Sequence, residues 1–250
     1  MKKIELIQVE HNVKVGDICK TIEPNITEDC IFMFEGEPVG FFITQITGKL
    51  KQFIEIANNE FRSERVPKSI MARASGVEQY STIIGSVPPK PHLRRPYPSV
   101  SSVHNTKSAR IFIKAMMGAC REAEAILKEI LPEQYEKQVK LIEEYVPKKY
   151  RFGKCFTSSI NNYNIPAPFH RDTANIKGCV NVIITKKLDA TGGNLHVPDY
   201  SATMNSSDNS MLVYPAWRNV HGVTPIIPTK EGGYRNSLVF YPLASFKGKE

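Results

Sequence analysis

The chain has 250 residues, of which 41% are hydrophobic, enough for one folded domain with a substantial core. It contains no apolar run near 18 residues, which excludes a membrane-spanning helix of ordinary length. Its net charge of +8 and its pI of about 9.2 suit a polyanionic partner, nucleic acid first, although solubility alone explains such a charge equally well.

The N-terminal residues and the cysteines favour an intracellular protein. Residues 1–10 begin like a signal peptide, but Glu5 and Glu10 interrupt the apolar part and no small-residue cleavage site follows. The five cysteines are odd in number, widely spaced and without a C-x-x-C motif, which favours reduced thiols over disulfides or a zinc site. They are Cys19, Cys30, Cys120, Cys155 and Cys179.

Hydrophobic periodicity predicts strands and helices in the first part of the chain. Residues 2–10 and 30–45 alternate like strands, and E-G-E-P within the second stretch predicts a hairpin turn. Residues 48–64 and 107–131 carry apolar side chains at three- and four-residue steps, which predicts amphipathic helices. Pro132 is suited to the first turn of another helix.

Residues 66–104 are predicted to form a long irregular arm. The segment is rich in proline, and it is too long for a simple connector within a domain. Basic residues, among them Lys90, Arg94 and Arg95, alternate with aromatic residues, and such mixtures can follow phosphates and stack on bases. A proline-stiffened surface arm without a ligand explains the composition equally well.

From residue 152 onward, short strands separated by turn residues predict a sandwich or jelly roll. One of these strands leads into the stretch F-H-R-D-T-A-N. His170 and Asp172 stand two residues apart, so on a strand they share one face. A histidine and a carboxylate on one face are two thirds of a 2-His-1-carboxylate iron site. The pair alone is a weak signal, because H-x-D also occurs in turns and surface ion pairs.

The rest of the chain supplies the missing parts of such a site. His221 follows Asp172 by 49 residues and begins another strand-like stretch, while Arg235 and Ser237 share one face of a later strand. Three ligands on one side of Fe(II) leave room for 2-oxoglutarate and O2. The far carboxylate of 2-oxoglutarate suits the bidentate, permanently charged guanidinium of an arginine, with a hydroxyl as a further donor.

Four stretches carry a family resemblance: H-R-D-x-x-N at 170–175, L-H-V-P at 195–198, H-x-x-T-P at 221–225 and R-x-S-L-V-F-Y at 235–241. With them the chain resembles the Fe(II)/2-oxoglutarate dioxygenases, and most closely the TET/JBP group, which oxidises the 5-methyl group of pyrimidines in DNA. The resemblance implies an α+β fold, a double-stranded β-helix (jelly-roll) core with supporting helices. We expect a single dioxygenase domain over 1–250. Its N-terminal strands, basic arm and supporting helices would lie in 1–150, and the main part of the core in 151–250.

The resemblance also implies a role for each matching residue. The implied iron ligands are His170, Asp172 and His221. The implied contacts of 2-oxoglutarate are Arg235, Ser237, His196 and, from the loosely matching upstream region, Arg73. The implied contacts of a flipped-out base are Asn175, Tyr241 and Val239. In this reading the arm residues Arg94 and Arg95 would hold the phosphates around that base.

The chain departs from the animal members of the group in its base-reading part. Ala174 and Leu243 stand where those members carry histidines, and their cysteine-rich zinc region is absent. We therefore expect hydroxylation of 5-methylcytosine in DNA, with further oxidation left open and thymine as an alternative target. A 2-oxoglutarate hydroxylase of a protein or small molecule, and a DNA-binding module with a dead site, are the competing hypotheses. The expected protein is a monomer that binds DNA and no membrane, in the cytoplasm of a microbe or of a virus-infected cell; protein partners stay open.

Overall fold

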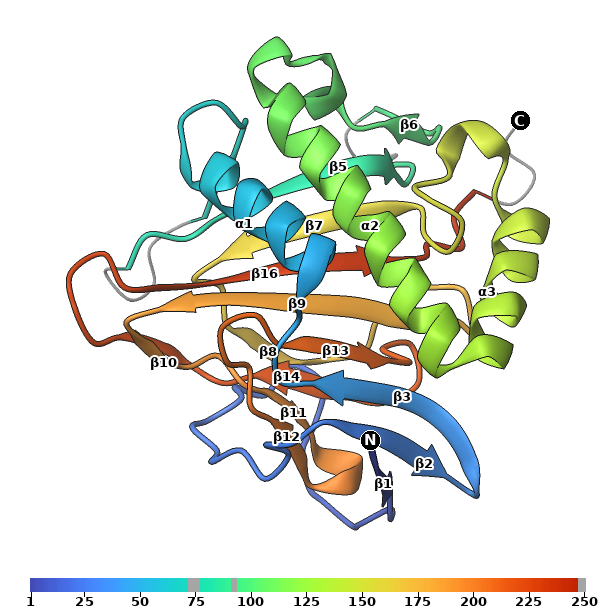
Figure 1. Ribbon diagram of the computed structural model, residues 1–250, viewed down its shortest axis with the longest axis vertical. Coiled ribbons are helices and arrows are strands. Elements are labelled where there is room, and N and C mark those ends of the chain that lie inside the picture. Colours follow the sequence, from blue (N-terminus) through green and yellow to red (C-terminus); the bar gives the residue numbers. More distant parts are fainter. Residues whose placement is uncertain (72–76, 91–93, 247–250) are drawn as a thin grey trace.

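A ten-stranded mixed sheet, called the large sheet below, runs through the middle of the structure, and three helices cover one of its faces (Figure 1). The computed structural model describes residues 1–71, 77–90 and 94–246. β6 (Ser99–Val100) pairs with β5 at one end of the sheet. The other strands lie in the order β1 (Lys2–Glu5), β2 (Cys30–Phe34), β3 (Glu37–Ile43), β13 (Met211–Tyr214), β9 (Asn181–Leu188), β16 (Tyr234–Tyr241), β7 (Ser158–Tyr163), β5 (Tyr80–Val87) and β4 (Ser69–Ile70).

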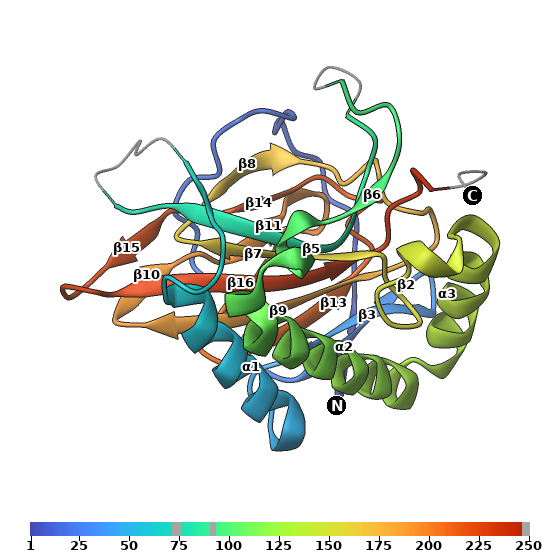
Figure 2. The same ribbon diagram turned by 90° about the horizontal axis from the view of Figure 1, so that it is seen from above.

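A four-stranded antiparallel sheet, the small sheet, lies on the side of the large sheet that the helices leave open (Figure 2). Its strands lie in the order β12 (Ala202–Met204), β11 (Leu195–Val197), β14 (His221–Val223) and β8 (Ala167–His170). A separate two-stranded ribbon consists of β10 (Ala190–Gly192) and β15 (Ile226–Pro228). Two sheets packed face to face are the arrangement expected of a jelly roll.

The helices are amphipathic, as the apolar spacing predicts. They are α1 (Gly48–Arg62), α2 (Arg110–Ile130) and α3 (Pro132–Tyr145), and Pro132 does occupy the first turn of α3. On α1 the buried side chains include Leu50, Ile54 and Phe61, which recur at three- to four-residue steps. Full burial of side chains of this size stabilises the fold by about 1.5–3 kcal/mol each. None of the helices in the described part of the chain is long and apolar enough to cross a membrane.

Side chains of the central strands alternate between the helix layer and the small sheet. Val182 and Ile184 of β9 and Leu238 and Phe240 of β16 belong to the hydrophobic core under the helices. Because successive side chains of a strand point to opposite faces, their sequence neighbours point toward the small sheet. This second side is called the inner face below.

The hairpin predicted at E-G-E-P is confirmed, whereas the strand predicted over 2–10 is shorter. β2 and β3 are joined by Glu35 and Gly36, whose φ angles of 54° and 80° fit a tight two-residue hairpin turn. β1 ends at Glu5, and the following residues run across the small sheet instead. There the backbone N–H of Gly16 donates to the carbonyl of Phe169 at 2.7 Å. All five cysteines are buried free thiols, as predicted.

The prediction of an irregular arm over 66–104 is wrong in one respect. β5 is an eight-residue strand inside this segment, and it pairs with β7 along six residue positions. Its sequence, Y-S-T-I-I-G-S-V, contains no proline, so the prolines on either side bound a strand rather than extend a loop. Residues before 150 thereby contribute six of the ten strands of the large sheet, namely β1 to β6.

Candidate active site

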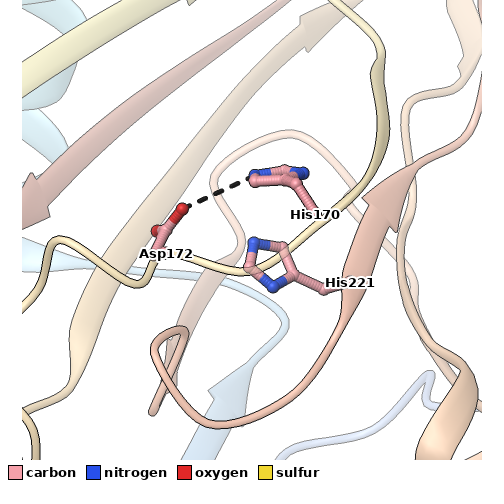
Figure 3. A group of neighbouring side chains, drawn as sticks. All are labelled: His170, Asp172 and His221. Carbon is pink, nitrogen blue, oxygen red and sulfur yellow. Dashed lines mark ion pairs between the residues drawn. The ribbon is translucent and has the colours of Figure 1, made fainter. Parts of the chain in front are cut away.

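Three side chains that can bind a metal meet at one edge of the small sheet (Figure 3). His170 ends β8 and His221 begins β14, and the two residues lie opposite each other in the antiparallel register. Asp172 follows two residues after His170, and its backbone N–H donates to the carbonyl of Ala216 at 3.1 Å. The possible ligand atoms of the three residues all lie within 4.8 Å of one another.

Hydrogen bonds fix which nitrogen of each histidine faces the cluster. Nδ1 of His170 lies 2.8 Å from the carbonyl of Pro168, and Nδ1 of His221 lies 3.1 Å from the carbonyl of Asn219. A carbonyl can only accept, so each Nδ1 carries the proton and each Nε2 has a free lone pair. Nε2 of His170 lies 3.6 Å from Oδ1 of Asp172.

The electrostatics of the cluster suit a divalent metal ion. His221 is 3% exposed, and its burial together with the neighbouring His170 ring lowers its pKa to about 4. It is therefore neutral at neutral pH, which is the form that binds metals. Two imidazole nitrogens and one carboxylate oxygen on one side of a centre are the donor set of the non-haem Fe(II) oxygenases, so these residues fit iron.

A pair of asparagines, Asn181 and Asn175, holds the carboxylate of Asp172 in place. Asn181 was not predicted from the sequence. Nδ2 of Asn181 donates to Oδ2 of Asp172 at 2.9 Å, which leaves Oδ1 facing His170. Oδ1 of Asn181 in turn accepts from Nδ2 of Asn175 at 2.8 Å. Asn181 has no motif around it, because only the pairing of β9 with β13 brings it to this place. Asn175 is 5% exposed and was predicted as a base contact.

Replacing Asn181 with alanine should weaken metal binding about 10- to 100-fold, the usual effect of removing a group that orients a metal ligand. The measurement is an anaerobic Fe(II) titration. Asn161→Ala is the matched control, because Asn161 is a buried asparagine of the same sheet that faces the helices. Within the described part of the chain, its amide atoms have no hydrogen-bond partner. Equal affinities of the two variants would show that Asn181 does not orient Asp172.

Arg235 forms the second part of the site. It lies on the inner face of β16 with Ser237, Val239 and Tyr241, two residues apart along the strand. Its side chain is 2% exposed, and burial lowers its pKa to about 10. Among the residues that the structure describes, its Nε has no hydrogen-bond partner. A buried guanidinium with an unpaired N–H costs free energy unless an anion completes it. The distal carboxylate of 2-oxoglutarate is an anion of this kind.

The profile of the Tet_JBP family, the oxygenase domain of the 2OGFeDO superfamily, matches residues 90–243, more than half of the chain. The chain belongs to the TET/JBP family. It is thus an Fe(II)- and 2-oxoglutarate-dependent dioxygenase, as the motifs predicted. No curated protein sequence gives a significant match.

One solved structure shares the fold at low sequence identity, and two others are less similar. The structure of NgTET1 with 5mC DNA is 14% identical, with a TM-score of 0.63 over 97% of this chain and 86% of that chain. An oxidoreductase of the 2OG-Fe(II) oxygenase family from Burkholderia pseudomallei is 12% identical, with a TM-score of 0.48 over 84% and 88% of the two chains. A prolyl hydroxylase from Trichoplax adhaerens, bound to a peptide of hypoxia inducible factor, is 12% identical, with a TM-score of 0.43 over 81% and 82%. The predicted double-stranded β-helix of the TET/JBP family is confirmed.

His196 lies on β11 of the small sheet. It pairs with Gly222 on β14, so its side chain leaves the small sheet on the side opposite to His221. There its ring meets the edge of Phe169, with centroids 6.0 Å apart, and its Nδ1 lies 2.8 Å from the hydroxyl of Thr203. This side of the small sheet faces the N-terminal segment, so the contact of His196 with 2-oxoglutarate stays a prediction.

The residues predicted to surround a base lie near the C-terminal end of β16. Tyr241 shares the inner face with Arg235, and burial raises its pKa. Val239 is half-buried between them. Leu243, in place of the histidine of animal TET/JBP members, forms a bridge with Asn175. The structure therefore brings Asn175, Leu243 and Tyr241 to one end of the site.

The basic residues of the predicted arm differ in their surroundings. Arg94 is exposed, with a φ angle of 57°, whereas the guanidinium of Arg95 donates to the carbonyl of Pro88 and to the hydroxyl of Ser99. Lys90 pairs with Arg95 through the backbone. Arg95 thus ties the base of the loop together, whereas Arg94 is exposed. Arg73 lies outside the described residues.

Proposed function

We propose that the protein hydroxylates the 5-methyl group of a pyrimidine base in DNA, with 5-methylcytosine as the first candidate. The observation that carries the proposal is the TET/JBP match over residues 90–243, which include both the His170–Asp172–His221 cluster and Asn175. The net charge of +8 favours binding to a polyanion. The solved NgTET1 structure contains 5mC DNA, which makes this base the first to test.

In this proposal His170, Asp172 and His221 hold Fe(II), and Arg235 and Ser237 bind the distal carboxylate of 2-oxoglutarate. Bound iron and 2-oxoglutarate together supply the oxidation of a C–H bond by O2. The protein itself orients the metal ligands and the cosubstrate. Asn181 fixes the carboxylate of Asp172, and the buried position of Arg235 keeps water away from the far end of the cosubstrate.

Asn175 is the residue proposed to read the base. Its Nδ2 already donates to Asn181, while its Oδ1 and second N–H are available to the edge of a pyrimidine. An amide presents a donor and an acceptor, so it can pair with cytosine or with thymine. A base within a duplex cannot reach the cluster, so the target must be flipped out or single-stranded.

The test is aerobic incubation of the purified protein with Fe(II), 2-oxoglutarate and ascorbate. One substrate is DNA with 5-methylated cytosines, and the other is the same DNA without modification. Nucleoside mass spectrometry then reads the products. Hydroxylated 5-methylcytidine supports the proposal, and hydroxylated thymidine supports it with thymine as the target. Turnover of 2-oxoglutarate on peptides or small molecules, with neither base changed, would overturn it.

Replacing Arg94 with alanine should weaken DNA binding. It should also reduce the slope of the logarithm of the binding constant against the logarithm of the salt concentration by about one, which is the effect of losing one phosphate contact. Fluorescence anisotropy at several salt concentrations measures both quantities. Lys51→Ala is the matched control, because Lys51 is an exposed cation on α1 in the helix layer. An unchanged slope would remove Arg94 from the DNA interface.

A further inference from the structure

A second cation lies beside Arg235 on the inner face of the large sheet. Lys187 of β9 is directly opposite Arg235 of β16 in the antiparallel register. The next pair on the same face is Thr185 opposite Ser237. Residues that lie directly opposite have Cβ atoms about 4.5–5.5 Å apart. The two cations are therefore neighbours, and the two hydroxyls lie next to them on the same face of the sheet.

The two cations reach the same backbone segment. Nζ of Lys187 donates to the carbonyl of Gly192 at 2.7 Å. The Cγ and Cδ atoms of Arg235 lie 3.2 Å from the position that a Cβ on Gly193 would take, and Gly193 has a φ angle of 68°. Gly192 and Gly193 therefore let both side chains come close to the backbone, and the two cations lie on the same face of the large sheet.

No carboxylate balances this pair of cations. Within residues 1–71, 77–90 and 94–246, neither Lys187 nor Arg235 forms an ion pair with an acidic side chain. Asp208, the acidic neighbour, accepts the backbone N–H of Lys187 and pairs with the ammonium of Lys186. Burial, and then the charge of Arg235, lower the pKa of Lys187 to about 8. A buried guanidinium beside a half-buried ammonium is unfavourable until an anion joins them.

We propose that Lys187 and Arg235 bind the distal carboxylate of 2-oxoglutarate together, and that Lys187 makes the site selective for a dicarboxylic 2-oxo acid. A carboxylate has two oxygens with about four acceptor sites, so it can take a guanidinium and an ammonium at once. The inference rests on the proposed role of Arg235, and it does not depend on which substrate is hydroxylated.

Binding calorimetry without O2, with Mn(II) in place of iron, tests this inference. The ligands are 2-oxoglutarate and 2-oxobutyrate, which keeps the 2-oxo acid and lacks the distal carboxylate. Lys187→Gln should bind 2-oxoglutarate about tenfold more weakly, the usual effect of losing a charged hydrogen bond, and should bind 2-oxobutyrate like the wild type. Glutamine can still donate to the carbonyl of Gly192, so a purely structural role of Lys187 is largely preserved.

The pH dependence gives a second readout. The charged groups that face Lys187 are Arg235 on β16 and Asp208 in the loop before β13. Only the protonated ammonium attracts the carboxylate, so the affinity of the wild type for 2-oxoglutarate should fall as the pH rises through about 8. Lys187→Gln should lack this fall, whereas Lys230→Gln, a change at an exposed lysine paired with Asp189, should keep it.

Three outcomes would overturn the inference. Lys187→Gln could bind 2-oxoglutarate like the wild type, it could lose both ligands equally, or the fall above pH 8 could persist in it. Equal loss would mean that Lys187 acts only through the Gly192 backbone. Because the experiment contains no DNA, a wrong assignment of the base would leave its result unchanged, and the two proposals can fail separately.

Discussion

Asp172→Asn should abolish iron binding and product formation together, each by at least about 100-fold, because even groups that only orient a metal ligand contribute about 10- to 100-fold. The change keeps the shape of the side chain and removes its negative charge. It also disturbs the hydrogen bond with Asn181, since an amide offers one oxygen where the carboxylate offers two. Anaerobic Fe(II) titration and nucleoside mass spectrometry measure the two losses.

Asp189→Asn is the matched control for this prediction. Asp189 makes an ion pair with the exposed Lys230, and its φ angle of 43° is one that asparagine tolerates well. It should keep the iron affinity and the activity of the wild type. The melting temperature of each apo variant separates a metal effect from unfolding. If Asp172→Asn stays folded and binds iron normally, the assignment of the carboxylate ligand is wrong.

The parts of the site that the sequence predicts well are those governed by local spacing. Arg235 and Ser237 are two residues apart on β16, and period-2 alternation decides this pair without knowledge of the partner strand. Asp172 follows two residues after His170, the last residue of β8, so their short separation in sequence keeps them together. The amphipathic helices and the β2–β3 hairpin were predictable for the same reason, because their signals are local.

The parts that escaped prediction depend on register between strands. A shift by one residue moves a side chain to the other face, and β11 has three residues, too few to show an alternation. The placement of His196 therefore follows from its pairing with Gly222 rather than from its motif. Asn181 and Lys187 reach the site through the neighbours of β9, which no linear pattern records.

The arm illustrates how composition can hide a strand. The many prolines in 66–104 pointed to an irregular segment, yet the eight residues of β5 lie between them and contain none. Arg94 and Arg95 also look equivalent in the sequence, while the structure uses Arg95 within the loop and leaves Arg94 exposed. Under the proposed function, the arm consequently offers DNA fewer exposed cations than its count of basic residues suggests.

Arg235→Met should weaken the binding of 2-oxoglutarate by more than about 100-fold without destabilising the apoprotein. The guanidinium is buried beside Lys187, and no described residue pairs with its Nε, so in the absence of the cosubstrate it contributes little to stability. Replacing a poorly compensated buried charge with an apolar side chain of similar length is often neutral or stabilising by about 1–4 kcal/mol. The melting temperature of the apo variant should therefore match or exceed that of the wild type.

The cosubstrate should reverse this order of stability. A ligand at 100 times its Kd stabilises a protein by about 2.7 kcal/mol, so saturating 2-oxoglutarate with Mn(II) should raise the melting temperature of the wild type and leave Arg235→Met unchanged. Arg235→Lys keeps the charge but loses the bidentate geometry, so its shift should lie between the two. A variant Arg235→Met that is unstable as apoprotein, and that 2-oxoglutarate stabilises as much as the wild type, would instead make Arg235 a structural residue and leave Lys187 to hold the carboxylate.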